Sequence, residues 1–124
     1  MKDQVTSIEQ SKRLIELGVP ADRASMVYRK TNIVGIVRLE VKKGKGGVVA
    51  PAFTVADLLA VLPKTIWGDQ KGWIHLIIRF PNEDHCKIVY DNSYNILWKC
   101  DGSLLSCIVE TIGWVITNGY RLNP

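Results

Sequence analysis

Long apolar runs are missing from this sequence. A helix that crosses a bilayer needs about 20 consecutive apolar residues, and the longest candidate, Leu104 to Ile116, is interrupted by Glu110 and Gly113. Residues 1 to 10 alternate charged and polar side chains and hold no apolar core after a basic start, unlike a secretion signal. Both absences predict a protein without a membrane contact, and we expect it in the cytoplasm.

Cysteine is scarce, and metal-binding pairs are absent. The three cysteines are Cys86, Cys100 and Cys107, an odd number that does not suit a disulfide-stapled secreted domain. A structural zinc site needs four ligands in short paired spacings, which these cysteines and the two histidines do not supply. We therefore expect reduced thiols that pack as small apolar side chains, with no metal and no cofactor.

Nucleotide-binding motifs are also missing. The glycine-rich stretch Gly44-Lys45-Gly46-Gly47 shares only its composition with a phosphate-binding loop. Such a loop needs four residues between its first glycine and a Gly-Lys-Ser/Thr triplet, and a helix directly afterwards. Here Val48 to Pro51 follows instead, so the stretch is expected to be a basic connecting loop.

Catalytic constellations are weak. A Cys/His hydrolase needs a thiolate beside an imidazole and a third group that orients the base. His85, Cys86 and Cys100 come nearest, because a guessed strand register puts His85 opposite Cys100. A pair of His75 with Asp91 can be imagined as well. A small enzyme with a Cys/His or His/Asp centre is therefore the alternative to a protein without catalytic activity.

What the sequence does contain fits an ordinary globular protein. Its 124 residues are 47% hydrophobic and 23% charged, which is close to the average for globular domains. The length is typical of one compact domain. We expect a single domain spanning residues 1–124.

Capping signals predict three helices. Thr6 or Ser7, followed by Glu9 or Gln10, begins a first helix that ends at about Leu17. A second helix follows Thr54 and ends at Pro63, before an irregular connection from Lys64 to Gly72. A third begins after Ser103 and continues to about Asn118.

Alternating and β-branched runs predict strands. One is expected near Ile33 to Val41, and three more at Trp73 to Phe80, Cys86 to Tyr90 and Tyr94 to Trp98. The connections between the last three are so short that the strands must form an antiparallel meander. The predicted class is α+β, with an antiparallel sheet of about four strands and helices packed on one face.

Two tryptophans fall on the polar side of their elements. Trp73 shares a mixed strand face with His75 and Arg79, and Trp114 lies with Cys107 on the helix side opposite the apolar stripe. Aromatic side chains in such places anchor partners, or they are covered by a terminus or loop. Trp73 and Trp114 are candidate partner contacts.

The basic charge is concentrated in one segment. Residues 29 to 45 carry a net charge of +5, whereas the whole chain carries +4. The basic residues of the segment are Arg29, Lys30, Arg38, Lys42, Lys43 and Lys45. Flexible cations of this kind neutralise phosphates without reading bases, or they keep a hairpin soluble and protect an edge strand. These six residues are the candidate anion or nucleic-acid contact.

Three blocks resemble an uncharacterised family of short proteins from gut anaerobes and their phages or mobile elements. The blocks are Gln10 to Pro20 with Met26 after it, Pro51 to Pro63, and Val109 to Asn118. The resemblance implies a compact α+β fold and supplies no active site. We therefore expect a non-enzymatic accessory or binding protein of a bacterial mobile element that acts by protein or nucleic-acid contact. A protein partner, a homodimer and nucleic acid all remain open.

Overall fold

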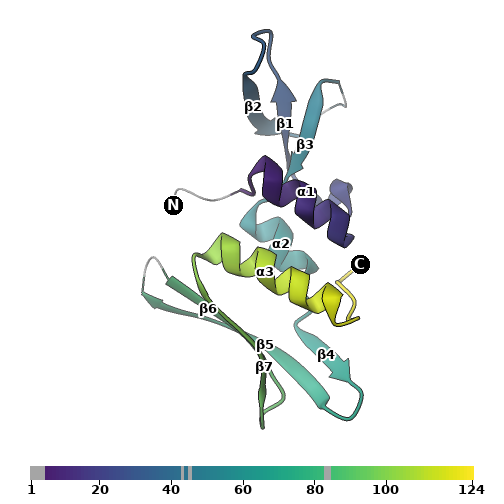
Figure 1. Ribbon diagram of the computed structural model, residues 1–124, viewed down its shortest axis with the longest axis vertical. Coiled ribbons are helices and arrows are strands. Elements are labelled where there is room, and N and C mark those ends of the chain that lie inside the picture. The colour runs from purple at the N-terminus through teal and green to yellow at the C-terminus, as the bar shows by residue number, and fades with distance from the viewer. Residues whose placement is uncertain (1–4, 43, 45, 83–84) are drawn as a thin grey trace. The chain divides into compact units, whose positions relative to one another are not determined.

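The computed structural model describes residues 5–42, 44, 46–82 and 85–124. The chain divides into two compact units, residues 1–58 and 59–124, and each contains helix and antiparallel sheet (Figure 1). The predicted α+β class is confirmed. The elements in order are α1 (Ile8–Leu17), a 3-10 turn (Ala21–Arg23), β1 (Met26–Lys30), β2 (Val37–Val41), β3 (Val48–Ala52), α2 (Val55–Val61), β4 (Thr65–Gly68), β5 (Gly72–Asn82), β6 (His85–Asp91), β7 (Ile96–Gly102) and α3 (Leu104–Thr117).

The first unit contains a three-stranded antiparallel sheet in the order β2-β1-β3. Sequence patterns predicted β2 but wrongly extended it back to Ile33, and they missed β1 and β3. The segment from Thr31 to Ile36 forms the turn of the β1–β2 hairpin, closed by the Thr31 N–H donating to the Ile36 carbonyl at 3.1 Å. Strand β1 therefore lies at the centre of the sheet, and β2 and β3 are its edges.

Helix α1 forms as its capping signals predict. The Ser7 side chain accepts from the Gln10 N–H at 3.1 Å, and the Gln10 side chain accepts from the Ser7 N–H at 2.9 Å. Gly18 ends the helix at a φ of 113°, a conformation that glycine adopts without strain. The helix packs against β3.

A buried polar network joins the start of α1 to the end of β3. The Thr6 hydroxyl lies 2.7 Å from the Ser11 hydroxyl and accepts from the Phe53 N–H at 3.0 Å. Ser11 in turn donates to the Ser7 carbonyl at 2.8 Å. The Tyr28 hydroxyl of β1 donates to the Thr6 carbonyl at 2.8 Å. Each buried side-chain polar atom of the network has a hydrogen-bond partner, so these bonds offset the cost of removing the groups from water.

Asp57 in the first turn of α2 closes the loop before β1. Its Oδ2 accepts from the Thr54 N–H at 2.9 Å, and from the N–H and hydroxyl of Ser25 at 2.9 and 2.8 Å. Burial acts to raise the pKa of Asp57, but the hydrogen bonds from Thr54 and Ser25 together hold it below its ordinary value. The ionised carboxylate is thus the form that the fold stabilises.

The second unit contains a four-stranded antiparallel sheet in the order β4-β5-β6-β7. The predicted meander of its last three strands is confirmed, but β7 runs from Ile96 to Gly102 instead of from Tyr94 to Trp98, because Tyr94 lies in the turn after β6. Strand β4 lies inside the segment expected to be irregular, Lys64 to Gly72, and pairs Trp67 with Trp73 of β5. It was missed because a four-residue strand with a single buried apolar side chain, Ile66, has almost no periodic pattern.

Helix α3 packs on β6 and β7. Trp114 stacks on Tyr90 and Trp98 with ring centroids 5.3 and 5.7 Å apart. Trp98 donates its indole N–H to the Thr111 hydroxyl at 3.0 Å. The prediction that Cys107 and Trp114 lie on the polar side of this helix is therefore wrong, because this side faces the sheet. The helix is apolar nearly all round, so its pattern did not show which side meets the strands.

No helix in the described part of the chain is long and apolar enough to cross a bilayer.

Replacing Thr6 by Val should lower the free energy of unfolding by about 1–3 kcal/mol, since the buried Phe53 N–H loses its acceptor while side-chain volume is kept. Urea unfolding followed by circular dichroism measures the change. The same substitution at the exposed Thr117 is the control. Equal stability of the two variants would contradict the role of the network.

Replacing Asp57 by Asn should cost about 1 kcal/mol at neutral pH, because a neutral amide oxygen accepts the hydrogen bonds from Thr54 and Ser25 more weakly than a carboxylate does. The lowered pKa means that the charge stabilises the fold above the ordinary value of 3.8 and that this gain is lost as pH falls through the folded-state pKa. Unfolding measured from pH 7 downward should show wild type and variant converging. A constant difference down to the lowest pH would contradict this.

Candidate functional site

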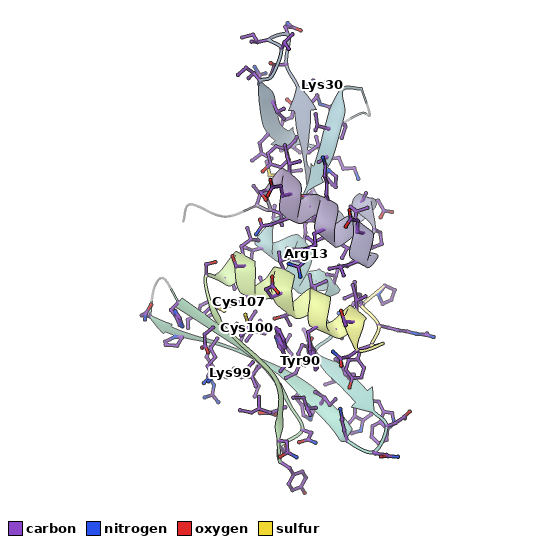
Figure 2. The ribbon with its side chains drawn as sticks, viewed as in Figure 1. Arg13, Lys30, Tyr90, Lys99, Cys100 and Cys107 are labelled. Atoms are coloured by element: carbon purple, nitrogen blue, oxygen red, sulfur yellow. The ribbon has the colours of Figure 1, made fainter. Side chains whose placement is uncertain are left out.

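The predicted basic residues lie on the three-stranded sheet and its loops. Arg29 and Lys30 belong to β1, Arg38 belongs to β2, and Lys42 follows β2 directly; Lys30 is labelled in Figure 2. Lys43 and Lys45 lie outside the described residues. Arg29 and Arg38 are direct cross-strand neighbours, so their side chains share one face.

Arg29 is already neutralised within the chain. Its Nε forms an ion pair with the Glu40 carboxylate, and its Nη1 donates to the Gly46 carbonyl. The ion pair lies on the face that also carries Arg38, because Glu40 and Arg38 are two residues apart on the same strand and therefore point to the same side. The positive charge of the described sheet therefore rests mainly on Lys30, Arg38 and Lys42.

A polar hollow of about 190 Å³ lies beside this charge. Two arginines, one lysine, one glutamate and two small polar residues line it: Arg29, Lys30, Thr31, Asn32, Arg38 and Glu40. Its size suits a small anion or a few waters. The hollow brings three of the six predicted basic residues together.

Exposed apolar side chains are the stronger feature of the same hairpin. We define the hairpin surface as its turn and β2 residues with large exposed apolar side chains: Ile33 (66%), Val34 (100%), Ile36 (53%), Val37 (39%), Leu39 (39%) and Val41 (68%). An apolar hollow of about 440 Å³ is lined by the turn, Val37 and Val49. Single exposed apolar residues are common, but a contiguous group marks an interaction site.

The sequence contained the signal for the hairpin surface but not its meaning. Alternation of Val37, Leu39 and Val41 with Arg38 and Glu40 predicted a strand with one apolar face. Such a face is ordinarily buried against a helix. Here β2 is an edge strand with every residue at least partly exposed, because α1 packs on the opposite edge, β3.

Trp73 lies in the open and has an aromatic neighbour. It is 57% exposed, and Trp67 of β4, at 58%, meets it edge to face with ring centroids 5.1 Å apart. Sequence reasoning singled out Trp73 and overlooked Trp67, because β4 was not predicted. Trp73 therefore stays a candidate partner contact, together with Trp67.

Trp114, the other tryptophan singled out, is half-buried. Besides Tyr90 and Trp98 it contacts the Tyr120 ring at 5.6 Å. These three aromatic contacts account for the partial burial of Trp114.

The sheet separates the thiols from the imidazoles. Cys86 and His85 are consecutive on β6 and so point to opposite faces. The register places Cys100 opposite Ile88, so the guessed pairing of His85 with Cys100 is wrong. Figure 2 shows Cys100 and Cys107 between α3 and the sheet. No Cys/His centre is formed by these residues.

The thiols on the helix side are poor nucleophiles. Burial raises the pKa of Cys86. Burial also raises the pKa of Cys107 to about 12, and a hydrogen bond with the Cys100 thiol adds to the shift. A thiolate is the reactive form, so both groups stay inert at neutral pH. Among the described residues, no group of three or more His, Cys, Asp or Glu side chains could hold a metal.

On the other face, imidazoles and carboxylates are paired. His85 Nε2 lies 3.8 Å from Asp101 Oδ1, and both side chains are more than two-fifths exposed. His75 lies opposite Asp91 across β5 and β6. The alternative of a small enzyme with a His/Asp centre therefore keeps two candidate pairs, both on an exposed face of the sheet.

A thiol reagent at neutral pH should label Cys86 and Cys107 slowly in the native protein, because both are protonated and buried. The half-exposed Cys100 is the internal reference, and unfolding in urea should make all three react. Mass spectrometry of proteolytic fragments assigns each label. Rapid stoichiometric labelling of Cys86 or Cys107 would instead indicate an activated nucleophile.

Comparison of the chain with protein-family models, with curated proteins and with solved structures found no match. The resemblance of the three sequence blocks to a family of mobile-element proteins therefore stays a prediction. The surface chemistry of the two sheets is the basis for the function proposed below.

Proposed function

We propose that the chain is a non-enzymatic binding protein whose contact site is the hairpin surface, and that its partner is a protein. The observation that carries the proposal is the group of six large apolar side chains exposed on the hairpin turn and on β2. Burial of such side chains against a partner lowers the free energy of the complex. Unpaired backbone groups along the same edge strand can form hydrogen bonds with the partner as well.

Charge favours a protein over nucleic acid. Nucleic-acid affinity comes largely from cations that are available to phosphates, whereas Arg29 is held by Glu40 and Gly46. Lys30, Arg38 and Lys42 are exposed on the same hairpin, and the rim of a protein interface is polar in the same way. The role in a mobile element belongs to this proposal only through the resemblance.

A catalytic function has less support. The sheet places thiols and imidazoles on opposite faces, and the His/Asp pairs lie on an open surface. Enzymes gather such groups in a concave site that excludes water.

The proposal is tested with the double variant Leu39→Ser and Val41→Ser as bait in affinity capture from the native host. The capture of specific proteins should fall at least about tenfold, because two central apolar contacts are lost. Ile96→Ser, which alters a 59% exposed side chain in the second unit, is the matched control. Unchanged capture by the double variant would overturn the assignment of the site.

Nucleic acid is the other outcome of this test. Purified protein is titrated with duplex and single-stranded DNA at about 50 mM salt, where phosphate contacts are strong. We expect no binding to either DNA that depends on Arg38 or Lys42, so the Arg38→Glu and Lys42→Glu variants should behave as the wild type does. Tight binding with a steep salt dependence, lost in these variants and kept in the Leu39→Ser and Val41→Ser double variant, would replace the protein partner by nucleic acid.

A further inference from the structure

We infer that the partner of the hairpin surface is a second copy of this chain, joined by antiparallel pairing of β2 with β2 about Leu39. The inference rests on the proposed function and names its partner. It would join two three-stranded sheets into one continuous sheet. Three features of the first unit lead to it.

The first feature is the direction of the backbone groups of β2. The Thr31 N–H donates to the Ile36 carbonyl, and the Lys42 N–H donates to the Ser25 carbonyl, each at 3.1 Å. In an antiparallel pair, residues that bond to the neighbour alternate with residues that do not. Both bonded residues of β2 and its flanks, Ile36 and Lys42, have even numbers.

It follows that the odd-numbered residues point their backbone groups outward. These are Val37, Leu39 and Val41, and their N–H and C=O groups face the open edge. A second β2 centred on Leu39 presents the same residues in return. Leu39 then pairs with Leu39 of the second copy, and Val37 pairs with Val41, and each pair exchanges two backbone hydrogen bonds.

The second feature is that the opposite edge of the sheet is protected. Val27 bonds to Glu40 on β2 by the same alternation, so its neighbour on β3, Pro51, turns its backbone nitrogen outward. Proline has no N–H to donate there and is a common device for closing an edge. Beyond it, the isolated bridge between Val5 and Thr54 continues the same side. Within the described part of this three-stranded sheet, β2 is therefore the edge that can pair.

The third feature is the charge pattern of β2, which reads Val37-Arg38-Leu39-Glu40-Val41. Pairing about Leu39 places Arg38 opposite Glu40 of the second copy on the polar face, twice by symmetry. These are non-hydrogen-bonded positions, where opposite side chains approach most closely. Within one chain Arg38 lies opposite Arg29 instead, and like charges directly opposite are unfavourable.

The pattern also fixes the register. A slip by two residues in one direction brings Arg38 against Arg38, and a slip in the other direction brings Glu40 against Glu40. A slip by one residue would turn Leu39 toward the polar face of the second copy. Only the register about Leu39 pairs opposite charges on one face and apolar side chains on the other.

The experiment measures the mass of the purified full-length chain by sedimentation equilibrium over about a hundredfold range of concentration. We expect a monomer–dimer equilibrium in the wild type. Arg38→Glu and Glu40→Arg should each weaken the dimer about tenfold or more, because each sets like charges opposite one another. Arg79→Glu makes the same charge change on the exposed end of β5 and is the matched control.

Mixing the two charge variants distinguishes this pairing from general stickiness. Arg38→Glu and Glu40→Arg chains are complementary to each other, so an equimolar mixture should associate more tightly than either variant alone. If each single variant is monomeric and the mixture does not associate more tightly, the proposed register is overturned. Because Glu40→Arg also removes the partner of Arg29, circular dichroism must show that each variant is folded.

Leu39→Pro provides a second variant that does not depend on charge. Its missing N–H points outward, so the fold of the single chain loses no hydrogen bond while the dimer loses its central pair. Retention of a wild-type dimer in Leu39→Pro would overturn the inference.

The outcomes also separate this inference from the proposed function. A wild type that stays monomeric, while the Leu39→Ser and Val41→Ser double variant still loses its captured host protein, overturns the second copy and leaves the protein-binding function intact. A monomer whose capture is unaffected by that double variant overturns both. A dimer that only the Ser variants weaken, and neither charge variant, overturns the proposed register.

Discussion

In each unit a helix packs on only part of a sheet, and the strands that it does not contact keep apolar side chains exposed to water. A sheet has two faces and two edges, and buried backbone groups need partners whereas exposed ones do not. Helix α1 packs on β3, and α3 packs on β6 and β7. The β1–β2 turn with β2 in one unit, and β4 with β5 in the other, carry nine of the fourteen large exposed apolar side chains of the described residues.

The cover is built differently in the two units. In the first, a hydrogen-bonded set of hydroxyl and backbone groups about Thr6 fixes the helix to the strand, and directional bonds of this kind specify one arrangement. In the second, the stacked rings of Tyr90, Trp98 and Trp114 fill the space under α3. Large aromatic side chains contribute mostly through the area that they bury.

Signals that lie within a few residues of each other predicted the helices and the meander. The capping residues Ser7 and Gln10, the stop at Gly18 and the short turns of the second sheet needed no knowledge of the rest of the chain. Strands β1, β3 and β4 escaped prediction because their pairing partners are distant or their sequences lack alternation. Met26–Lys30 ends in two cations, and Val48–Ala52 contains a proline that only an edge position explains.

The candidate site was predictable in its residues but not in its character. Charge counting found Arg29 and Arg38, yet only the register shows that they share a face and that Glu40 holds one of them. Periodicity showed that Leu39 belongs to an apolar face, yet exposure depends on which strand the helix covers. The thiol and imidazole groups misled in the same way, because Asp91 pairs with Ile96 rather than with Tyr94 and a bulge between Tyr90 and Asp91 shifts the register once more.

Pro51 bears on how large an assembly of this chain can become. A sheet with two pairing edges adds subunits without limit and grows into a fibre, whereas a sheet with one such edge is used up by a single two-fold contact. With β3 closed, a contact at β2 would leave the three-stranded sheet no second edge for a further copy. The missing N–H of one proline on β3 would then limit association through this sheet to two copies.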